Sequence, residues 1–360
     1  MAVSTIDPNG LNIGQIGGTR NKIINGAMVI DQRNAGAIYN PPPNQGYSLD
    51  RWTTWLSQNT FSVQQNAGAV TPPAGFSNYL GVTVTSATTI GVSDYFGVGH
   101  KIEGYNIADL NWGTANAQDI TLSFWVRSSL TGNFGAVIRR GDGGQYYAFT
   151  YPVSAANTWE YKTVTIAGPT TGSWNTTNGT GLFLLFGLGA GSNQTAGSND
   201  TWVNGGVLGA SGATPVVATN GATFYITGVQ LEAGDTATPF EHRSYGQELA
   251  LCQRYYEKSF DTGAAPGTSG NGAQLAYCPG NINRVYGTIV CRVTKRAAAT
   301  YTIYSTSGAT GQMRDASAGV DIATTLTTTA GENGVGIAST AGISAVTNQI
   351  QFHYTASAEL

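Results

Sequence analysis

The sequence predicts an all-β protein: a jelly-roll β-sandwich, one connecting α-helix, and then a second small β domain. The main observation is a repeated pattern between Asn21 and about Glu241. Runs of roughly four to eight residues alternate apolar and polar side chains, and Gly, Pro, Asn or Asp bounds each run. The second observation is composition, because 49 of 360 residues are glycine and only 10% are charged. Many short strands joined by Gly-rich turns are typical of sandwiches and barrels.

Within the sandwich, the alternation marks individual strands. The clearest are Tyr79–Val84, Asp119–Arg127, Gln145–Tyr151, Glu160–Ile166 and Thr223–Glu232. The sequence RGDGG at Arg140–Gly144 is suited to a hairpin turn. GLFLLFG, at Gly181–Gly187, is apolar at every interior position, which predicts a central strand covered on both faces. The long segment that follows, Leu188–Gly221, is predicted to be a functional or interface loop, or a disordered one.

One amphipathic helix is predicted for residues 244–258. Pro239 and Ser244 supply the stop and start signals. Four residues recur at positions i, i+4, i+7 and i+11 and form one apolar stripe: Tyr245, Leu249, Cys252 and Tyr256. A stripe this broad must be buried against something other than solvent. We therefore predict that these four residues form a contact between domains or between subunits.

The two ends of the chain differ from the sandwich, which is predicted to span 21–243. Residues 1–20 are rich in Gly and Asn and are expected to be an attachment arm that orders against a partner, or else a frayed terminus. Residues 259–360 are predicted to form a C-terminal β domain, the exposed tip, after a linker or long loop at Thr262–Ala273. Its predicted strands are Arg284–Arg296, Thr300–Tyr304, Gly334–Ala338 and Gln349–Tyr354. Small residues dominate this region, so its own core is expected to be thin and supported by neighbouring subunits.

Charge and cysteine content exclude several classes of partner. The net charge of −3 and the scattered 17 Lys and Arg residues lack the basic field of a nucleic-acid-binding protein. The three cysteines have no metal-ligand spacing and are expected to be reduced, buried thiols. No apolar run of about 18 residues occurs and the first residues do not resemble a signal peptide, so we expect no membrane insertion and folding in a cytoplasm.

No motif in the sequence indicates catalysis. The histidines His100, His242 and His353 lie far apart, without metal-site spacing. The chain has no GxSxG motif, and its Gly-rich stretches lack the ending of a phosphate loop. Five acids near strand ends leave glycoside cleavage open, although turn carboxylates are the commoner interpretation: Asp94, Glu103, Asp109, Asp119 and Glu160. We expect no enzyme activity, no cofactor and no metal site.

Aromatic side chains give the positive signal for binding. In the strand TLSFWVR, Leu122, Phe124 and Val126 point to one face, so Trp125 points to the other beside Arg127. A tryptophan on a polar face can stack on a sugar ring while neighbouring polar groups bind its hydroxyls. Four further aromatics are expected to extend this platform: Trp112, Tyr147, Trp174 and Trp202. The alternative is that these rings pack beneath the long loop or at a subunit contact, where large aromatics are also common.

Two segments of the chain resemble a known family. FYITGVQLEAGDTATPFEHRSYGQELALCQRYYEK, at Phe224–Lys258, closely resembles a segment of bacteriophage virion proteins, mostly tail fibres or tail proteins. NKIINGAMVIDQRNAGA, at Asn21–Ala37, and YSLDRW, at Tyr47–Trp52, resemble the opening of the same module. That family is similar to jelly-roll carbohydrate-binding modules, and its members are commonly trimeric. Residues 260–360 resemble no family.

The resemblance implies a virion protein made in the host bacterial cytoplasm. We expect a homotrimeric fibre or appendage subunit that binds other virion proteins through its N-terminal arm and a host-surface glycan elsewhere. The alternative is a capsid decoration or head-fibre protein attached to the phage head. A polysaccharide depolymerase would require the repeated coils of a β-helix, and the sequence has no such period.

Overall fold

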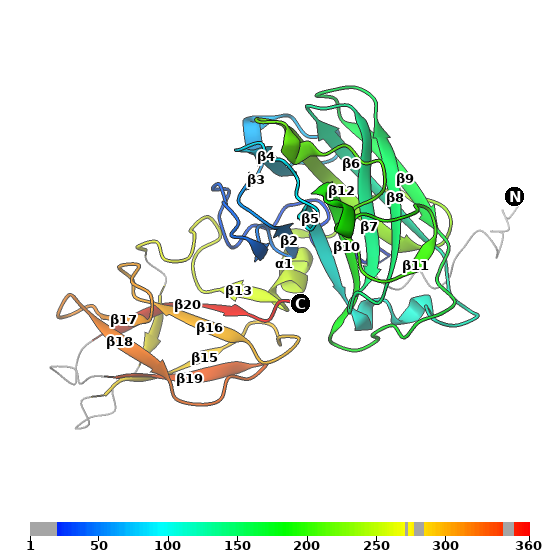
Figure 1. Cartoon of the computed structure of the whole chain (residues 1–360). Coiled ribbons are helices and arrows are strands. Elements are labelled where there is room, and N and C mark those ends of the chain that lie inside the picture. Colours follow the sequence, from blue (N-terminus) through cyan, green and yellow to red (C-terminus); the bar gives the residue numbers. More distant parts are fainter. Residues whose placement is uncertain (1–19, 271–272, 277–283, 341–348) are drawn as a thin grey trace, which may run out of the picture.

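The computed structural model describes residues 20–270, 273–276, 284–340 and 349–360. Residues 1–19 of the predicted attachment arm and Cys278 lie outside these residues. Within them the chain forms a larger and a smaller β unit with a single α-helix between them (Figure 1). The larger unit precedes the helix in the sequence, and the smaller unit follows it.

The larger unit is a jelly-roll β-sandwich of two antiparallel sheets. The order of the seven-stranded sheet is β1 (Asn44–Tyr47), β2 (Trp52–Leu56), β5 (Tyr95–Glu103), β10 (Thr180–Ala190), β7 (Gly132–Arg140), β8 (Gln145–Val153) and β11 (Trp202–Asn204). The order of the five-stranded sheet is β3 (Phe61–Gln65), β4 (Leu80–Val84), β12 (Thr223–Ala233), β6 (Ile120–Ser128) and β9 (Glu160–Ile166). Their inner faces enclose the main hydrophobic core.

Strand β10 is central and covered on both faces, as its unbroken apolar sequence predicts. Leu182, Leu184 and Phe186 point into the main core. On the outer face Phe183 and Leu185 pack against Leu208 of the long loop. That loop therefore covers part of the seven-stranded sheet and explains why β10 lacks alternation.

The α-helix, α1, spans Tyr245–Gln253 and is shorter than the sequence predicts. Its N-terminus is capped by Ser244, whose side chain accepts a hydrogen bond from the Gln247 amide. Tyr256 lies beyond the helix in β13 (Tyr256–Lys258), which pairs with Thr355–Ser357. Strand pairing with a distant segment ends the helix, and the local spacing of apolar residues cannot reveal it.

The smaller unit contains the remaining strands. They are β13, β14 (Gln274–Ala276), β15 (Tyr286–Val290), β16 (Thr300–Tyr304), β17 (Gln312–Asp315), β18 (Val320–Leu326), β19 (Gly334–Ser339) and β20 (Ile350–Ser357). The order is β13-β20-β17-β18-β19-β15, and β14 and β16 also pair with β20. The unit has a core of its own, which includes Met313, Phe352 and Tyr354. Its core is therefore more substantial than its many small residues predict.

The predicted strand Arg284–Arg296 is largely wrong, because only β15 forms within it. The basic residues after β15 lie outside the sheet and contact other parts of the chain. Lys295 forms a fully buried ion pair with Glu257, and Arg296 donates to the Asn178 carbonyl of the sandwich at 2.9 Å. A buried charge needs such a partner, and this requirement overrides the local strand propensity.

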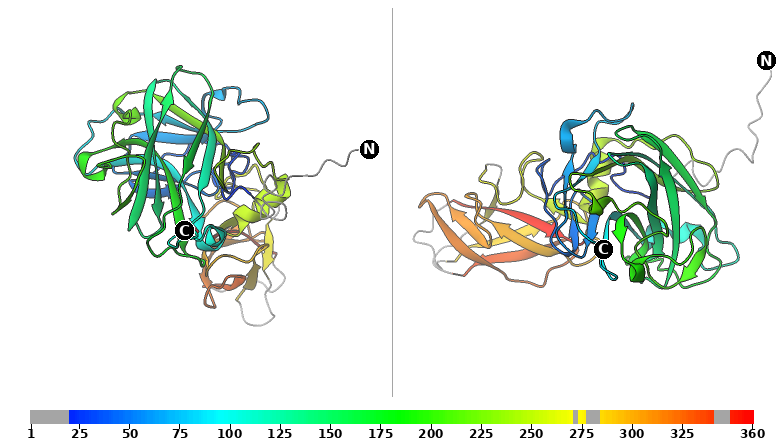
Figure 2. Two further views of the ribbon diagram at one scale, coloured as in Figure 1. Left: turned by 90° about the vertical axis from the view of Figure 1, so that its right-hand side faces the viewer. Right: turned by 45° about the horizontal axis from the view of Figure 1, so that its top comes forward.

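A polar junction joins the two units, and we define it by five residues. The Glu359 carboxylate accepts hydrogen bonds from Arg51 and, at 2.8 Å, from Arg33 of the sandwich. The Glu103 carboxylate accepts one from Arg254 at 2.6 Å. In both further views the two units lie side by side with α1 between them (Figure 2). Ion pairs between the units thus support the arrangement.

Candidate functional site

Trp125 lies on the outer face of the five-stranded sheet. Leu122, Phe124 and Val126 of the same strand, β6, are fully buried in the core between the sheets. Since side chains alternate along a strand, Trp125 is directed away from that core. This is the orientation that the sequence predicts.

An open pocket of ≈470 Å³ lies around Trp125, and we call it the aromatic groove. Its lining comes from strands β6, β9 and β12, from the β3–β4 loop, and from the segment after β12. The lining residues are Ala74, Phe76, Ser123, Trp125, Tyr161, Gly228, Pro239, Phe240 and His242. None is a lysine, arginine, aspartate or glutamate.

The rings of the groove form two groups. Trp125 and Tyr161 are neighbours across the β6–β9 register, with ring centroids 5.3 Å apart. The second group consists of Phe76, Phe240 and His242, whose centroids lie 4.9 to 5.4 Å apart. Tyr161 is 45% exposed, so ligands in solution can reach the ring. Aromatic walls with few hydrogen-bonding groups favour the apolar faces of a sugar over a charged substrate.

Gly228 allows the loop to approach the sheet. It has a φ of +60° and lies in the register shift of β12 against β6 between Thr227 and Gln230. A Cβ at this position would lie 2.6 Å from the Phe76 ring. The absence of a side chain therefore lets Phe76 form one wall of the groove.

Arg127 does not line the groove, although it follows Trp125 on the same face. Its Nε donates to the Asn157 carbonyl at 3.0 Å, and its guanidinium lies 5.6 Å from the centre of the Tyr225 ring. The prediction that Arg127 binds sugar hydroxyls beside Trp125 has no support in this geometry. The hydrogen bond to the Asn157 carbonyl instead holds the Arg127 side chain near Tyr225 of β12.

The other four predicted aromatics form a separate group, the indole cluster: Trp112, Tyr147, Trp174 and Trp202. The three indole rings lie 4.7 to 5.6 Å apart, and Tyr147 lies 5.4 Å from Trp202. Trp112 and Trp174 belong to the core between the sheets, and the other two pack against it. Trp125 lies on the opposite face of the five-stranded sheet, so the cluster does not extend the platform. Trp202 belongs to the long loop, and the other three rings pack against it, which resembles the alternative interpretation of packing beneath that loop.

The predicted interface residues have different environments. Cys252 is fully buried, and Leu249 packs partly buried beside it against Ile24 and Tyr255. Tyr256 is buried beneath the Arg33 guanidinium, 3.7 Å from the ring centre. Tyr245, at the start of the helix, is 49% exposed. Three of the four thus pack within the chain, and Tyr245 alone of them has a largely free surface.

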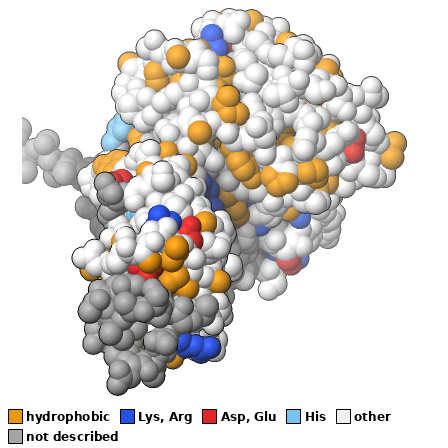
Figure 3. Space-filling view, turned by 90° about the vertical axis from the view of Figure 1, so that its left-hand side faces the viewer, with side chains coloured by type: hydrophobic (Ala, Val, Ile, Leu, Met, Phe, Trp, Pro, Cys, Tyr) orange, Lys and Arg blue, Asp and Glu red, His pale blue; other side chains and the backbone are white. Residues whose placement is uncertain are grey.

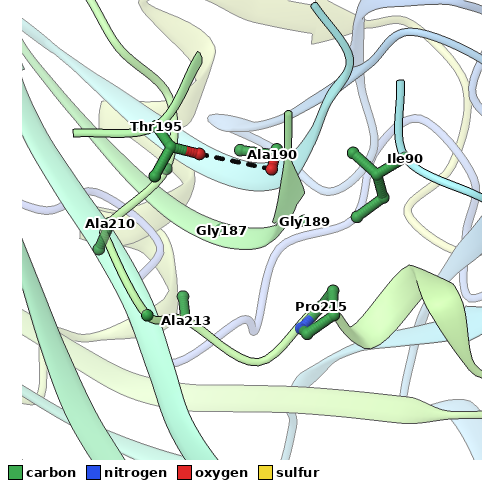
Figure 4. A pocket seen from close by; sticks show the side chains of 10 residues that line it. Ile90, Gly187, Gly189, Ala190, Thr195, Ala210, Ala213 and Pro215 are labelled. Carbon is green, nitrogen blue, oxygen red and sulfur yellow. Dashed lines mark hydrogen bonds between the residues drawn. The ribbon is translucent and has the colours of Figure 1, made fainter. Parts of the chain in front are cut away.

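A further pocket of ≈270 Å³ lies beside β10 (Figure 4). Small residues line most of it, including Gly187, Gly189 and Ala213, with Ile90 and Pro215 at one side. Thr195 Oγ1 donates to the Ala190 carbonyl at 3.4 Å. With no titratable side chain in its lining, this pocket offers no group for catalysis.

The acidic residues considered for catalysis have partners inside the chain. Asp94, Glu103, Asp109, Asp119 and Glu160 accept hydrogen bonds from Gly91, Arg254, Lys22, Gly168 and Lys162, respectively. In the described part of the chain, no group of three or more His, Cys, Asp or Glu side chains is placed to hold a metal ion. These acids have structural partners in turns and ion pairs.

Two histidines are buried and one is exposed. His100 contacts the Ile24 carbonyl through Nε2 at 3.0 Å, and burial together with Arg51 lowers its pKa well below the usual range. His353 stacks on Phe260 with centroids 4.1 Å apart. His242 is the exposed one and lines the aromatic groove. This role of His242 could not be predicted, because Phe76 and His242 lie far apart along the chain.

Charged side chains are sparse on the face shown in Figure 3, where hydrophobic side chains are scattered among polar ones. Of the helices in the described residues, none has the length and apolar character needed to cross a membrane. Cys252 and Cys291 are free thiols, and Cys291 is only partly buried, contrary to expectation.

Comparisons with known proteins give distant likenesses. No family model and no curated protein matches the chain. A tailspike protein 4 enzymatically active domain of bacteriophage CBA120 is 14% identical, with a TM-score of 0.32, over 60% of this chain and 22% of that one. TmCBM61 in complex with β-1,4-galactotriose is 11% identical, with a TM-score of 0.30, over 60% of this chain and 100% of that one.

A family 11 carbohydrate-binding module of Clostridium thermocellum, in complex with a mixed-linked tetrasaccharide, is 12% identical with a TM-score of 0.27. The match covers 54% of this chain and 97% of that module. The chain thus spans about a fifth of the tailspike domain and nearly all of the two binding modules. Likenesses with TM-scores this low carry no argument about function. The function therefore has to be argued from the aromatic groove.

Proposed function

We propose that the chain is a non-enzymatic subunit of a bacteriophage fibre or appendage that binds a host-surface glycan in the aromatic groove. The observation that carries the proposal is the groove itself. A half-buried tryptophan and an exposed tyrosine stand beside a second wall of three rings, and no charged side chain lines the space. Sugar rings present apolar C–H faces, which stack on aromatic side chains of this kind.

The fibre role rests on the resemblance of residues 21–37, 47–52 and 224–258 to bacteriophage virion proteins. The low charge supports it, because a particle surface with few charged groups limits nonspecific electrostatic binding. Incubating the full chain with host polysaccharide and measuring its size by chromatography tests the absence of catalysis. Shortened polysaccharide would contradict the proposal.

Replacing Trp125 tests the groove. Loss of one stacking ring removes about 1 to 1.5 kcal/mol, so Trp125→Ala and Tyr161→Ala should each weaken binding about tenfold on an array of bacterial surface glycans. Trp55→Ala is the matched control, because Trp55 is a partly buried tryptophan on the outer face of the other sheet. Equal binding by wild type and Trp125→Ala would refute the role of the groove.

Locating the chain on the particle tests the fibre role separately. We expect labelled antibody against the smaller unit to mark a tail fibre in electron micrographs of intact particles. Label on the capsid surface would instead identify a head-fibre or decoration protein.

A further inference from the structure

The aromatic groove contains one deeply buried polar side chain, that of Ser123. Ser123 lies two residues before Trp125 on the same face of β6, it lines the groove, and it is only 2% exposed. Residues at positions i and i+2 of a strand lie roughly 7 Å apart and point the same way. The Ser123 hydroxyl group is therefore placed on the floor of the groove, beside the Trp125 ring.

This hydroxyl group has no partner within the protein. Among the described residues Ser123 Oγ forms no hydrogen bond, and it is not sealed from solvent as the unpaired Tyr151 hydroxyl is. The neighbour of Ser123 in β12 is Gln230, whose amide group instead bonds Glu232 at 2.9 Å and the Glu241 amide at 2.8 Å. Ser123 Oγ can therefore donate and accept hydrogen bonds within the groove.

The indole N–H group of Trp125 is the second, independent observation. Trp55 Nε1 is sealed inside the protein without a partner. Trp125 Nε1 also has no hydrogen-bond partner among the described residues, but it is not sealed, and Trp125 lines the groove. Since a buried tryptophan usually finds a partner for this group, Trp125 keeps a donor for a ligand. The other five of the seven tryptophans donate to backbone carbonyls: Trp52, Trp112, Trp159, Trp174 and Trp202.

These two polar atoms restrict what the groove can bind. An aliphatic or aromatic occupant would cover Ser123 Oγ and Trp125 Nε1 without pairing them, and a buried polar group without a partner opposes binding. No lysine or arginine lines the groove, so a carboxylate or phosphate would be buried there without a counterion. Hydroxyl groups fit, because they accept from Trp125 and both donate to and accept from Ser123.

We infer that Ser123 determines which sugar the aromatic groove accepts. The inference rests on the proposed binding of a glycan in this groove, and it names the class of sugar: a neutral hexopyranose with a free hydroxyl group facing Ser123. The apolar face of the sugar stacks on the Trp125 ring, and Ser123 Oγ forms a hydrogen bond with that hydroxyl group. Trp125 Nε1 donates to a hydroxyl group of the adjoining sugar in the chain.

The first experiment compares neutral and acidic sugars on the full chain. The probes are methyl β-D-galactopyranoside, methyl β-D-glucopyranoside, methyl α-D-mannopyranoside and, as the acid, methyl β-D-glucopyranosiduronic acid, each titrated by NMR. We expect the best neutral probe to bind with a millimolar Kd and more tightly than the acid. Failure of every neutral probe to bind, or tighter binding of the acid, would overturn the inference.

The second experiment compares Ser123→Ala with wild type on the best neutral probe and on its deoxy derivatives, each of which lacks one hydroxyl group. Loss of one neutral hydrogen bond should weaken binding of the parent probe about threefold to tenfold. One deoxy derivative should bind wild type as weakly, and Ser123→Ala should not weaken its binding further. Equal binding of the parent by both proteins, or further weakening of every deoxy derivative, would overturn the inference.

The melting temperature separates binding from folding. Ser123→Ala removes a hydroxyl group without a partner, so the melting temperature should be unchanged. Thr121→Ala is the matched control on the same face of β6, because Thr121 lies outside the groove lining and its hydroxyl donates to the Gly234 carbonyl at 2.8 Å. It should lower the melting temperature and leave binding unchanged.

Equal weakening of binding by Thr121→Ala and Ser123→Ala would assign the effect to the strand and would overturn the role of Ser123. The proposed function has a separate test, because Trp125→Ala should weaken binding to the glycan array whichever class of sugar the groove accepts.

Discussion

Asp50 is a buried carboxylic acid in the sandwich, close to where the units meet. Its carboxylate accepts hydrogen bonds from the Gln32 amide at 2.7 Å and from Gln32 Nε2 at 2.5 Å. Burial raises its pKa to about 6, although Arg33 and these hydrogen bonds oppose the shift. Because the folded chain holds this proton more tightly than the unfolded chain, the stabilising contribution is complete below about pH 4 and is lost as the pH rises through about 6.

Asp50→Asn should remove this pH dependence. The shift from 3.8 to about 6 corresponds to an effect on the order of 3 kcal/mol. We therefore expect the free energy of unfolding of the variant, measured in urea at pH 4, 5, 6 and 7, to increase relative to that of wild type as the pH rises. Asp235→Asn, at an exposed position, is the control. Parallel curves for wild type and Asp50→Asn would show that the Asp50 pKa is not raised.

At the scale of elements, strands whose pattern is local could be predicted well. Strand β9 has the predicted bounds, and β6 differs by one residue at each end. The helix and β15 were predicted too long, because Tyr256 pairs with β20 and Lys295 pairs with Glu257. β20 and Glu257 are distant in sequence from the residues they contact, so no local pattern predicts these contacts.

The same distinction applies to the site. The direction of Trp125 follows from strand alternation, which is local. The opposite wall could not be predicted, because Phe76 belongs to the β3–β4 loop and Phe240 to the segment after β12. The indole cluster does not extend the platform, because local sequence does not reveal that Trp112 and Trp174, which lie between strands, are buried in the core.

Glu359, which follows β20 in the chain, has an energetic role that can be tested. Glu359 lies between the Arg33 and Arg51 guanidiniums, and its side chain is 7% exposed. Glu359→Gln leaves the buried Arg51 guanidinium without its carboxylate partner and weakens the pairing of the partly exposed Arg33, which should cost about 3 to 5 kcal/mol of unfolding free energy. Chemical denaturation measures this loss. Glu332→Gln, at an exposed position, should change stability by less than about 0.5 kcal/mol.

A small effect of Glu359→Gln would mean that the junction is held by other contacts. The Glu103 carboxylate is the next candidate, since it binds both Arg254 and, at 2.6 Å, the Tyr255 hydroxyl. Burial alone would raise its pKa, but these hydrogen bonds hold the pKa below its usual value. It therefore stays charged at neutral pH.

At the scale of the whole molecule, the packing of α1 changes how assembly should be tested. The sequence places Leu249 at an interface, and the structure shows that it packs against Ile24 and Tyr255 within the same chain. An aspartate at Leu249 would unfold this contact and would give no clear result on assembly. Tyr245 is 49% exposed at the helix N-terminus, where an aspartate is compatible with the helix dipole.

We therefore expect Tyr245→Asp to separate assembly from folding. The proposed trimer predicts that the wild-type chain sediments at three times the mass of one chain, and that Tyr245→Asp shifts the population toward single chains. The far-ultraviolet circular dichroism should be unchanged, since the substituted side chain leaves the core intact. Tyr105→Asp is the matched control, because Tyr105 is 59% exposed in the short turn Gly104–Asn106 of the sandwich and is not part of α1. If the wild type sediments as a single chain, or if Tyr245→Asp and Tyr105→Asp have the same mass as wild type, α1 does not form the contact between subunits.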